Sequence, residues 1–332
     1  MTKTRTPSSP IHVVTIGGGS GQFALLSGLR DLPGLSITAV VSMMDSGGST
    51  GRLRDELGIL PPGDILKCIL ALSPHREIAR TILLKRFETN RRLRGHNSGN
   101  MLLTMLSQYT GSFPTGVAAL AEILEVKGII LPVTTDQATL VAELSDGSRI
   151  FSERAIDVPR GNQRHKIKDV FLVPHHGGQI RVHPPVLEAV RTSDFILMGP
   201  GDLYTSIVPN LIVPGVAESL RATRARIFYI LNIMTKFGET HQFRGIDFIE
   251  RLEACMGRQL DGIIYNNNPP SAEIRSRYRR RKSQWVQMES GQPHWVKRKL
   301  FSADLLETTG GVVRHDACKL AGLLKALFQG NA

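Results

Sequence analysis

Two apolar, largely β-branched runs each lead into a glycine-rich loop, and this pairing restricts the possible folds more than any other feature of the chain. Residues 11–16 precede the glycine-rich residues 17–21, and residues 37–42 precede, through two methionines, residues 45–52. Such runs, without polar alternation, are typical of parallel strands buried on both faces. Glycines after a strand let the backbone approach a ligand, and a following helix directs its first N–H groups at an anion. The sequence therefore predicts a phosphate site.

The rest of the chain continues this beginning as an α/β fold. Apolar residues from Phe23 to Leu29 predict a helix that Pro33 and Gly34 stop, so the first two strands form a βαβ unit of a parallel sheet. Residues 62–126 have a mostly helical pattern, and Asp64 is the expected N-cap of the first of these helices. Further strands are predicted at residues 128–133, 138–144, 149–151, 170–173, 195–198, 227–231 and 262–265.

We therefore predict a single Rossmann-like α/β domain over residues 1–332. Its core spans about residues 11–330 and holds a mostly parallel sheet with helices on both faces. A helical insertion is expected at about residues 62–126, and a basic segment at about residues 271–299. Several strands end in Gly, Asn, Asp or Ser, and the carboxyl ends of strands line the binding crevice of an open α/β sheet. One shared site is therefore expected.

The first loop departs from the dinucleotide-binding fingerprint. Gly17 and Gly19 match its first two glycines, but Gln22 stands at the third, and no acidic residue lies about 20 positions further on to accept a ribose hydroxyl. A nicotinamide cofactor is therefore not favoured. The residues of this loop expected to contact a ligand are Gly17, Gly18, Gly19, Ser20 and Gly21.

The second loop is not a P-loop, because it has no Gly-Lys-Ser or Gly-Lys-Thr. Its hydroxyls, backbone N–H groups and arginine suit a phosphate better than the nucleophile-elbow pattern that residues 47–51 formally satisfy. Gly48, Ser49 and Arg52 are expected to contact the ligand, and Asp45 is the candidate metal-binding residue.

Later segments contribute further candidates. Residues 95–100 lead into an apolar helix that Asn100 is expected to cap, and His96 is equally compatible with a ligand contact and with a structural role. Residues 199–206 place a proline between glycines at a strand end, followed by hydroxyls, which suits an anion. Asp316 is the expected N-cap of the last helix. The candidates from these regions are His96, Asn97, Asn100, Gly199, Pro200, Gly201, Tyr204, Thr205, Ser206, Asn210, Asn232, Asn266 and Arg314.

The net charge of +12 is concentrated in two places. Residues 271–299 carry an excess of seven positive charges and residues 85–94 an excess of four. Local patches of this kind suit acidic ligands or partners as well as nucleic acid, and we favour a solvated basic face over nucleic-acid binding. Three widely spaced cysteines, a polar N-terminus and no apolar run of membrane-spanning length predict a cytoplasmic protein without a membrane span.

Five segments taken in order resemble one family. IGGGSG, DSGGSTGRLRDELGILPPGD, GHNSGN, GPGDLYTSIVPN and VRHD are similar to the gluconeogenesis-factor group, often called YvcK, of the superfamily that includes the 2-phospho-L-lactate transferase CofD. The resemblance implies a Rossmann-like fold with a helical insertion and a cytoplasmic protein that binds UDP-type nucleotide sugars. It also implies a role in growth on gluconeogenic carbon sources and in cell shape. For the transferase branch it implies transfer of a phospholactyl group from a guanosine diphosphate derivative with Mg²⁺.

Three functional hypotheses follow. In a nucleotide-sugar-binding regulator, residues 17–21 and 199–201 hold the diphosphate, Asp45 and Asn232 orient the ribose or a metal-bound water, and Arg314 faces the diphosphate or sugar. In a transferase, Asp45 and Asp64 hold Mg²⁺. The gluconeogenesis-factor group usually has two adjacent acids here, whereas this chain has Asp45 followed by Ser46. Mg²⁺ would therefore have fewer carboxylate ligands, and nucleotide binding is favoured over catalysis. The third hypothesis is nucleic-acid binding through residues 275–282. A homo-oligomer is also expected.

Overall fold

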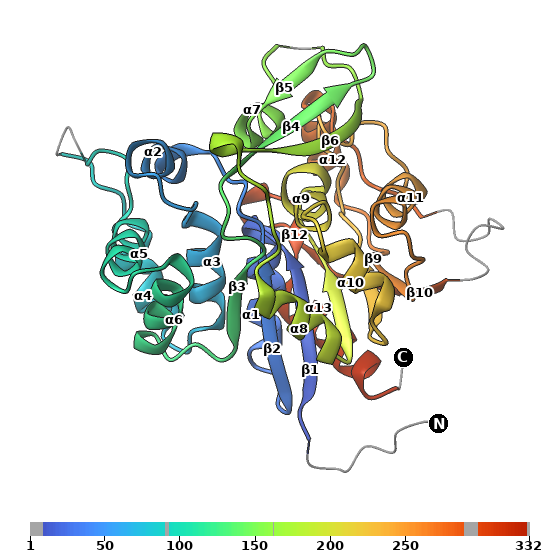
Figure 1. Ribbon diagram of the computed structural model, residues 1–332. Coiled ribbons are helices and arrows are strands. Elements are labelled where there is room, and N and C mark those ends of the chain that lie inside the picture. The colour runs from blue at the N-terminus through green and yellow to red at the C-terminus, as the bar shows by residue number, and fades with distance from the viewer. Residues whose placement is uncertain (1–8, 90–92, 162, 289–297, 331–332) are drawn as a thin grey trace.

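Figure 1 shows the computed structural model of the chain, in which a parallel seven-stranded sheet forms the centre. The structure describes residues 9–89, 93–161, 163–288 and 298–330, so residues 90–92 and 289–297 of the two predicted basic segments lie outside the described part. The strand order is β10-β9-β8-β7-β1-β2-β3. The strands are β1 (Ile11–Gly17), β2 (Leu35–Val41), β3 (Ile129–Pro132), β7 (Phe195–Met198), β8 (Arg226–Ile230), β9 (Gly262–Asn266) and β10 (Lys299–Ala303).

Helices cover both faces of this sheet, as predicted. The connection from β1 to β2 runs toward one edge of the sheet, and the connection from β7 to β8 runs toward the opposite edge. Both crossovers are expected to be right-handed, so their helices lie on opposite faces of the sheet. On one face α1 (Gly19–Leu29) packs against α3 (Gly63–Leu72) and α13 (Ala317–Phe328). On the other, α10 (Val216–Ala222) packs against α8 (Pro184–Thr192) and α11 (Gly245–Met256). The fold is therefore a doubly wound α/β fold.

Gln22 explains why the first loop lacks the third glycine of the dinucleotide fingerprint. Its side chain is buried, and its Nε2 donates to the hydroxyl of Thr15 at 3.1 Å and to the carbonyl of Val40 at 3.1 Å. Thr15 belongs to β1 and Val40 to β2, so the glutamine joins α1 to both strands. A glycine here would remove these bonds and leave buried polar groups unpaired, which is costly.

Between β2 and β3 the chain forms a group of helices, which lies at the left of Figure 1. Its members are α2 (Gly48–Leu57), α3, α4 (Arg76–Leu83), α5 (Ser98–Tyr109) and α6 (Phe113–Ile123). Residues 48–51, which the sequence analysis placed in a second glycine-rich loop, form the first turn of α2. Short polar residues are favoured at helix N-termini as well as in turns, so the sequence pattern does not separate the two.

Two predicted helix caps were wrong. The N-cap of α3 is Pro62, and Asp64 lies in the first turn, where its carboxylate accepts from Lys67 at 2.8 Å. The N-cap of α5 is Asn97, whose side chain accepts from the backbone N–H of Asn100 at 2.7 Å. The prediction for α13 is confirmed, because the Asp316 carboxylate accepts from the N–H groups of Cys318 and Lys319.

A smaller antiparallel sheet lies beyond the carboxyl ends of the parallel strands, at the top of Figure 1. It has the order β5-β4-β6, and a short helix, α7, follows β5. Its bounds and those of the remaining elements are β4 (Ala138–Leu144), β5 (Arg149–Phe151), α7 (Glu153–Asp157), β6 (Ile167–Pro174), η1 (His175–Gly177), η2 (Leu203–Ile207), α9 (Val208–Leu211), α12 (Ala272–Arg280), β11 (Leu306–Glu307), η4 (Thr309–Gly311) and β12 (Arg314–His315). Among the helices of the described residues, none has both the length and the apolar character needed to cross a bilayer.

Candidate functional site

A cleft of about 620 Å³ opens where the strand order of the sheet reverses, between β1 and β7. Its lining includes Gly18, Gly19, Ser20 and Gly21 after β1, and residues 200–202 after β7. In open α/β sheets this switch point at the carboxyl ends of the strands is where ligands bind. Two glycine-rich turns that are far apart in the sequence therefore form one site.

The N-terminus of α1 faces this cleft with the backbone of its first turn. Its N-cap is Gly18, which has extended backbone and, lacking a side chain, caps none of the first N–H groups. The first four N–H groups of a helix have no intrahelical partner, and the helix dipole makes this end attractive to an anion.

Gly21 holds the two turns in direct backbone contact. A Cβ atom at this position would lie 2.5 Å from the carbonyl carbon of Pro200 and 2.9 Å from the backbone nitrogen of Gly201. Real Cβ atoms essentially never come this close to another atom, so any other residue at this position would push the two turns apart. The close contact fixes the width of the cleft floor.

Polar and cationic side chains from the C-terminal half of the chain form the opposite wall. Asn232 lies at the end of β8, where its Nδ2 donates to the carbonyl of Gly201 at 2.8 Å. The hydroxyl of Tyr278 accepts the N–H of Val313 at 2.8 Å, which ties α12 to the segment that carries Arg314. Arg314 is exposed, and its guanidinium has no hydrogen-bond or ion-pair partner among the described residues, so it is available to an anion.

His315 follows Arg314 and also borders the cleft, although its side chain is largely buried. Burial lowers its pKa to about 4, so the ring is neutral at pH 7 and Arg314 supplies the positive charge of this segment.

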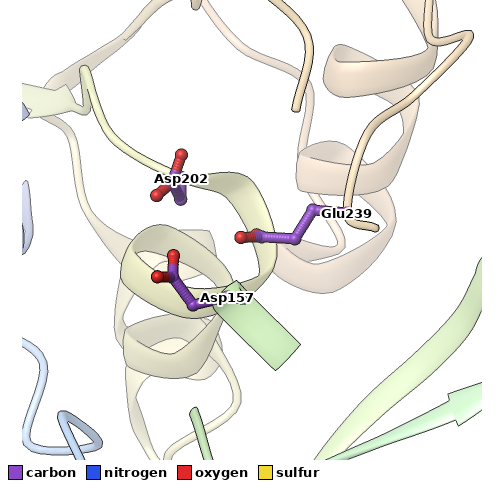
Figure 2. A group of neighbouring side chains, drawn as sticks. All are labelled: Asp157, Asp202 and Glu239. Carbon is purple, nitrogen blue, oxygen red and sulfur yellow. The ribbon is translucent and has the colours of Figure 1, made fainter. Parts of the chain in front are cut away.

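Lys236 is a second cation on the cleft wall, and three carboxylates neutralise it. Its Nζ donates to Asp157, to Asp202 at 2.7 Å and to Glu239, 3.1 Å away. Figure 2 shows these three carboxyl groups pointing toward one another from separate elements. Their oxygens lie within 4.8 Å of one another, close enough to hold a metal ion, but the lysine ammonium takes that position. The carboxylates raise the pKa of Lys236, so it stays charged.

Apart from the three carboxylates around Lys236, a pair of acids, Asp45 and Asp64, lies behind the first glycine turn. A Cβ on Gly18 would be 2.8 Å from Oδ2 of Asp64, and one on Gly63 would be 2.9 Å from Oδ2 of Asp45. Burial and the nearby Asp64 raise the pKa of Asp45, and burial together with Asp45 raises the pKa of Glu153 to about 7. Lys67 pairs with Oδ1 of Asp64 at 2.8 Å, whereas Asp45 and Glu153 hold their protons more firmly than free carboxyl groups do. Carboxylates placed in this way are suited to a divalent cation.

The other predicted residues of the second glycine-rich segment face the helical insertion. The Ser49 hydroxyl lies 3.0 Å from Nδ1 of His96, and Asn100 donates to the same hydroxyl at 3.3 Å. All three side chains are buried, and Arg52 donates to the carbonyl of Arg94 at 2.7 Å. This network joins α2 to α5, so we interpret these residues as structural.

Comparison with known proteins decides the family. The model of the family described as 2-phospho-L-lactate transferase CofD matches residues 13–306. A putative gluconeogenesis factor of Thermotoga maritima is 36% identical over 96% of this chain and 99% of its own length. The gluconeogenesis factor of Bacillus subtilis is 36% identical over 96% of this chain and 98% of its own length. The chain belongs to the gluconeogenesis-factor group of the CofD family.

A solved structure shows the same fold for this group. A crystal structure of a protein from Bacillus halodurans superposes on the CofD-family chain with a TM-score of 0.88 at 36% identity, covering 95% of this chain and all of the other. The predicted family and the predicted Rossmann-like α/β fold are therefore both confirmed.

The cleft of this CofD-family protein includes nine of the predicted ligand-binding residues. They are Gly18, Gly19, Ser20, Gly21, Pro200, Gly201, Ser206, Asn232 and Arg314. The predicted residues outside its lining are Gly17, Asp45, Gly48, Ser49, Arg52, His96, Asn97, Asn100, Gly199, Tyr204, Thr205, Asn210 and Asn266.

Several of the residues outside the lining bond to other protein groups. Asn210 donates to the carbonyls of Gly17 and Ser206, and Thr205 bonds to Glu239. Asn266 accepts from the N–H of Leu305, so these amide and hydroxyl groups hold neighbouring turns in place.

Other cleft residues were missed by the sequence analysis. The lining also includes Lys236, Phe237, Tyr278 and Arg281. Of these, Tyr278 and Arg281 lie in the arginine-rich run that the sequence analysis considered only for nucleic-acid binding. The available signal for Lys236 was its position shortly after the strand that ends at Ile230. Strand order, which the sequence does not state, brings that strand end to the cleft.

Proposed function

We propose that this protein binds a nucleotide diphosphate sugar of the UDP type in the cleft. The observation that carries the proposal is the meeting of two glycine-rich backbone turns at the switch point of the sheet, opposite the free guanidinium of Arg314. The volume of about 620 Å³ lies in the range of small-molecule sites, roughly 300–1,000 Å³. Backbone donors at a helix N-terminus and an arginine fork both favour a diphosphate.

In this assignment the diphosphate lies on residues 18–21 and residues 200–201. Arg314 reaches it from the opposite wall, and the rings of Tyr278 and Phe237 offer flat surfaces for a base or sugar. The relatives are named gluconeogenesis factors, which supports a role in gluconeogenic carbon metabolism, and we infer that this role is regulatory. A further part of the proposal is that the protein works in the cytoplasm as a homo-oligomer and influences cell shape.

Calorimetric titration with UDP-glucose, UDP-N-acetylglucosamine, GDP and NAD, with and without Mg²⁺, tests the proposal. We expect the UDP-sugars to bind and Arg314→Ala to weaken them about 10-fold or more, because a charge-assisted hydrogen bond contributes about 1.5–3 kcal/mol. Arg224→Ala is the matched control, since Arg224 is exposed and does not line the cleft. Unchanged affinity in Arg314→Ala would remove this residue from the site, and no heat with any of the four ligands would refute the proposal.

A transferase is the second candidate, and the Asp45–Asp64 pair behind Gly18 favours it. A divalent cation between these carboxylates would lie beside the proposed diphosphate and neutralise charge that develops on a leaving phosphate. We expect a transferase to bind a guanosine diphosphate ligand more tightly with Mg²⁺ and to turn it over. Asp45→Asn should then remove the Mg²⁺ dependence while leaving UDP-sugar binding without metal intact. If Mg²⁺ changed the affinity for the guanosine diphosphate ligand in neither the parent protein nor Asp45→Asn, this candidate would be excluded.

A further inference from the structure

A second cavity, of about 460 Å³, adjoins α12 near the cleft. Three arginines, three glutamines and two aromatic residues dominate its lining, and we call it the arginine pocket. Its lining residues are Gln242, Phe243, Arg244, Arg275, Arg279, Ser283, Gln284, Trp285 and Gln287.

Residues of α12 and of the segment just after it line both cavities. Arg275 and Arg279, four residues apart, share one face of the helix and line the arginine pocket, whereas Tyr278 and Arg281 line the cleft. Ser283, just beyond the helix, lines both cavities. The arginine-rich run of the sequence is therefore divided between two sites, and the proposed cleft function accounts for only one of them.

The charge of the arginine pocket is poorly compensated. No carboxylate of the described residues lines it, and of its three arginines Arg244 is paired with a carboxylate, that of Asp247 at 3.6 Å. Arg275 and Arg279 have no hydrogen-bond or ion-pair partner within the described residues. Like charges at this helical spacing repel each other by about 0.2–0.5 kcal/mol. An anion bound between them would remove that repulsion.

The backbone around the arginine pocket is also unusual. Gln242, which lines it, has φ +67°, and Lys282, next to Ser283, has φ +56°. These are two of the four non-glycine residues with positive φ in the described part of the chain. Lys282 has the left-handed conformation common just after a helix, since the N–H groups of Lys282 and Ser283 donate to the carbonyls of Arg279 and Tyr278 and so close α12. The positive φ of Gln242 costs free energy and lies in the lining itself, which agrees with the site that the lining chemistry indicates.

We propose that the arginine pocket is a second binding site, for a small phosphorylated metabolite. Guanidinium groups bind phosphate oxygens in a fork, glutamine amides hydrogen-bond polar substituents, and the rings of Phe243 and Trp285 give an apolar surface to the rest of the ligand. The volume of the pocket suits a ligand of this size. This site is independent of the diphosphate proposed for the cleft.

Trp285 provides a direct reporter for the experiment. The chain has two tryptophans, so Trp295→Phe leaves Trp285 as the sole one. We would titrate this protein with inorganic pyrophosphate at constant ionic strength, with and without saturating UDP-glucose, and follow tryptophan emission. The test variant adds Arg275→Gln and Arg279→Gln. The matched control adds Arg224→Gln and Arg280→Gln, which remove the same charge from residues that do not line the pocket.

We expect a saturable emission change that persists with UDP-glucose and that weakens about 10-fold or more in the test variant, since two charge-assisted contacts are lost. The control should keep the affinity, and UDP-glucose binding by calorimetry should be unchanged in both. No saturable change, or equal weakening in both double variants, would overturn the site.

A nucleic-acid surface predicts a different result. A 12-nucleotide oligouridylate would then bind with a steep salt dependence while pyrophosphate gave no signal, and this outcome would also overturn the small-ligand proposal. If UDP-glucose gave no heat while the Trp285 response remained, only the function proposed for the cleft would fail.

Discussion

Replacing Gly21 with alanine tests whether the two glycine turns depend on direct backbone contact. The added Cβ would lie 2.5 Å from the carbonyl carbon of Pro200 and closer still to its oxygen, whereas ordinary contact begins at 3.4 Å, so the two segments must separate by more than about 1 Å. Both sides of the contact are backbone, and no side-chain rotation relieves it. Overpacking of this kind costs about 1–3 kcal/mol, against a gain of about 1 kcal/mol from replacing glycine in a helix.

Gly322→Ala is the matched control, because Gly322 also lies inside a helix, α13, and a Cβ there meets nothing within 4 Å. Only the helix-propensity gain applies, so we expect this variant to be more stable than the parent by about 0.5–1 kcal/mol. The clash is between backbone atoms, so the cost for Gly21→Ala should be near the upper end of its range and the net loss about 1–2 kcal/mol. The two variants should therefore differ by about 2–3 kcal/mol.

Urea denaturation followed by far-ultraviolet circular dichroism measures this difference as a change in the free energy of unfolding. Calorimetry on the same proteins should show weaker UDP-glucose binding for Gly21→Ala only, because separation of the turns displaces the backbone donors. If Gly21→Ala were as stable as Gly322→Ala, the turns would not be in the contact described here, and the account of the cleft floor would be wrong.

Three further predictions concern groups around the core of the fold. Folding raises the pKa of Glu153 from 4.5 to about 7, so the folded protein holds a proton that the unfolded chain releases. The contribution of Glu153 to stability should therefore fall as pH rises from 4.5 to about 7 and then level off. The difference in unfolding free energy between the parent protein and Glu153→Gln, measured against pH, should show this fall. Asp316→Ala should lower the urea midpoint through a loss of about 1 kcal/mol, whereas Asp316→Asn, which still caps α13, should lose much less. Arg298→Ala leaves the nearly buried carboxylate of Glu253 without its guanidinium, and thermal unfolding should show a loss of about 3–5 kcal/mol; a loss below 1 kcal/mol would mean that this pair is solvated.

Local patterns in the sequence were sufficient for the elements and for the first glycine turn. Residues 138–144, 149–151 and 195–198 were predicted as strands with the bounds that the structure has, and Asp316 caps α13 as expected. These features depend on the period of apolar residues and on which side chains satisfy helix N–H groups, both of which operate over a few neighbouring residues. The family motifs are equally local, and they identified the CofD family.

Only the tertiary structure decided which polar residues share the cleft. Ser49 and His96 follow equally promising glycines, yet they bond to each other inside the helical insertion, while Lys236 and Tyr278 reach the cleft without a motif of their own. The reason is the strand order, which places the ends of β1, β7 and β8 side by side. That order depends on packing between segments far apart in the chain, so no local pattern specifies it.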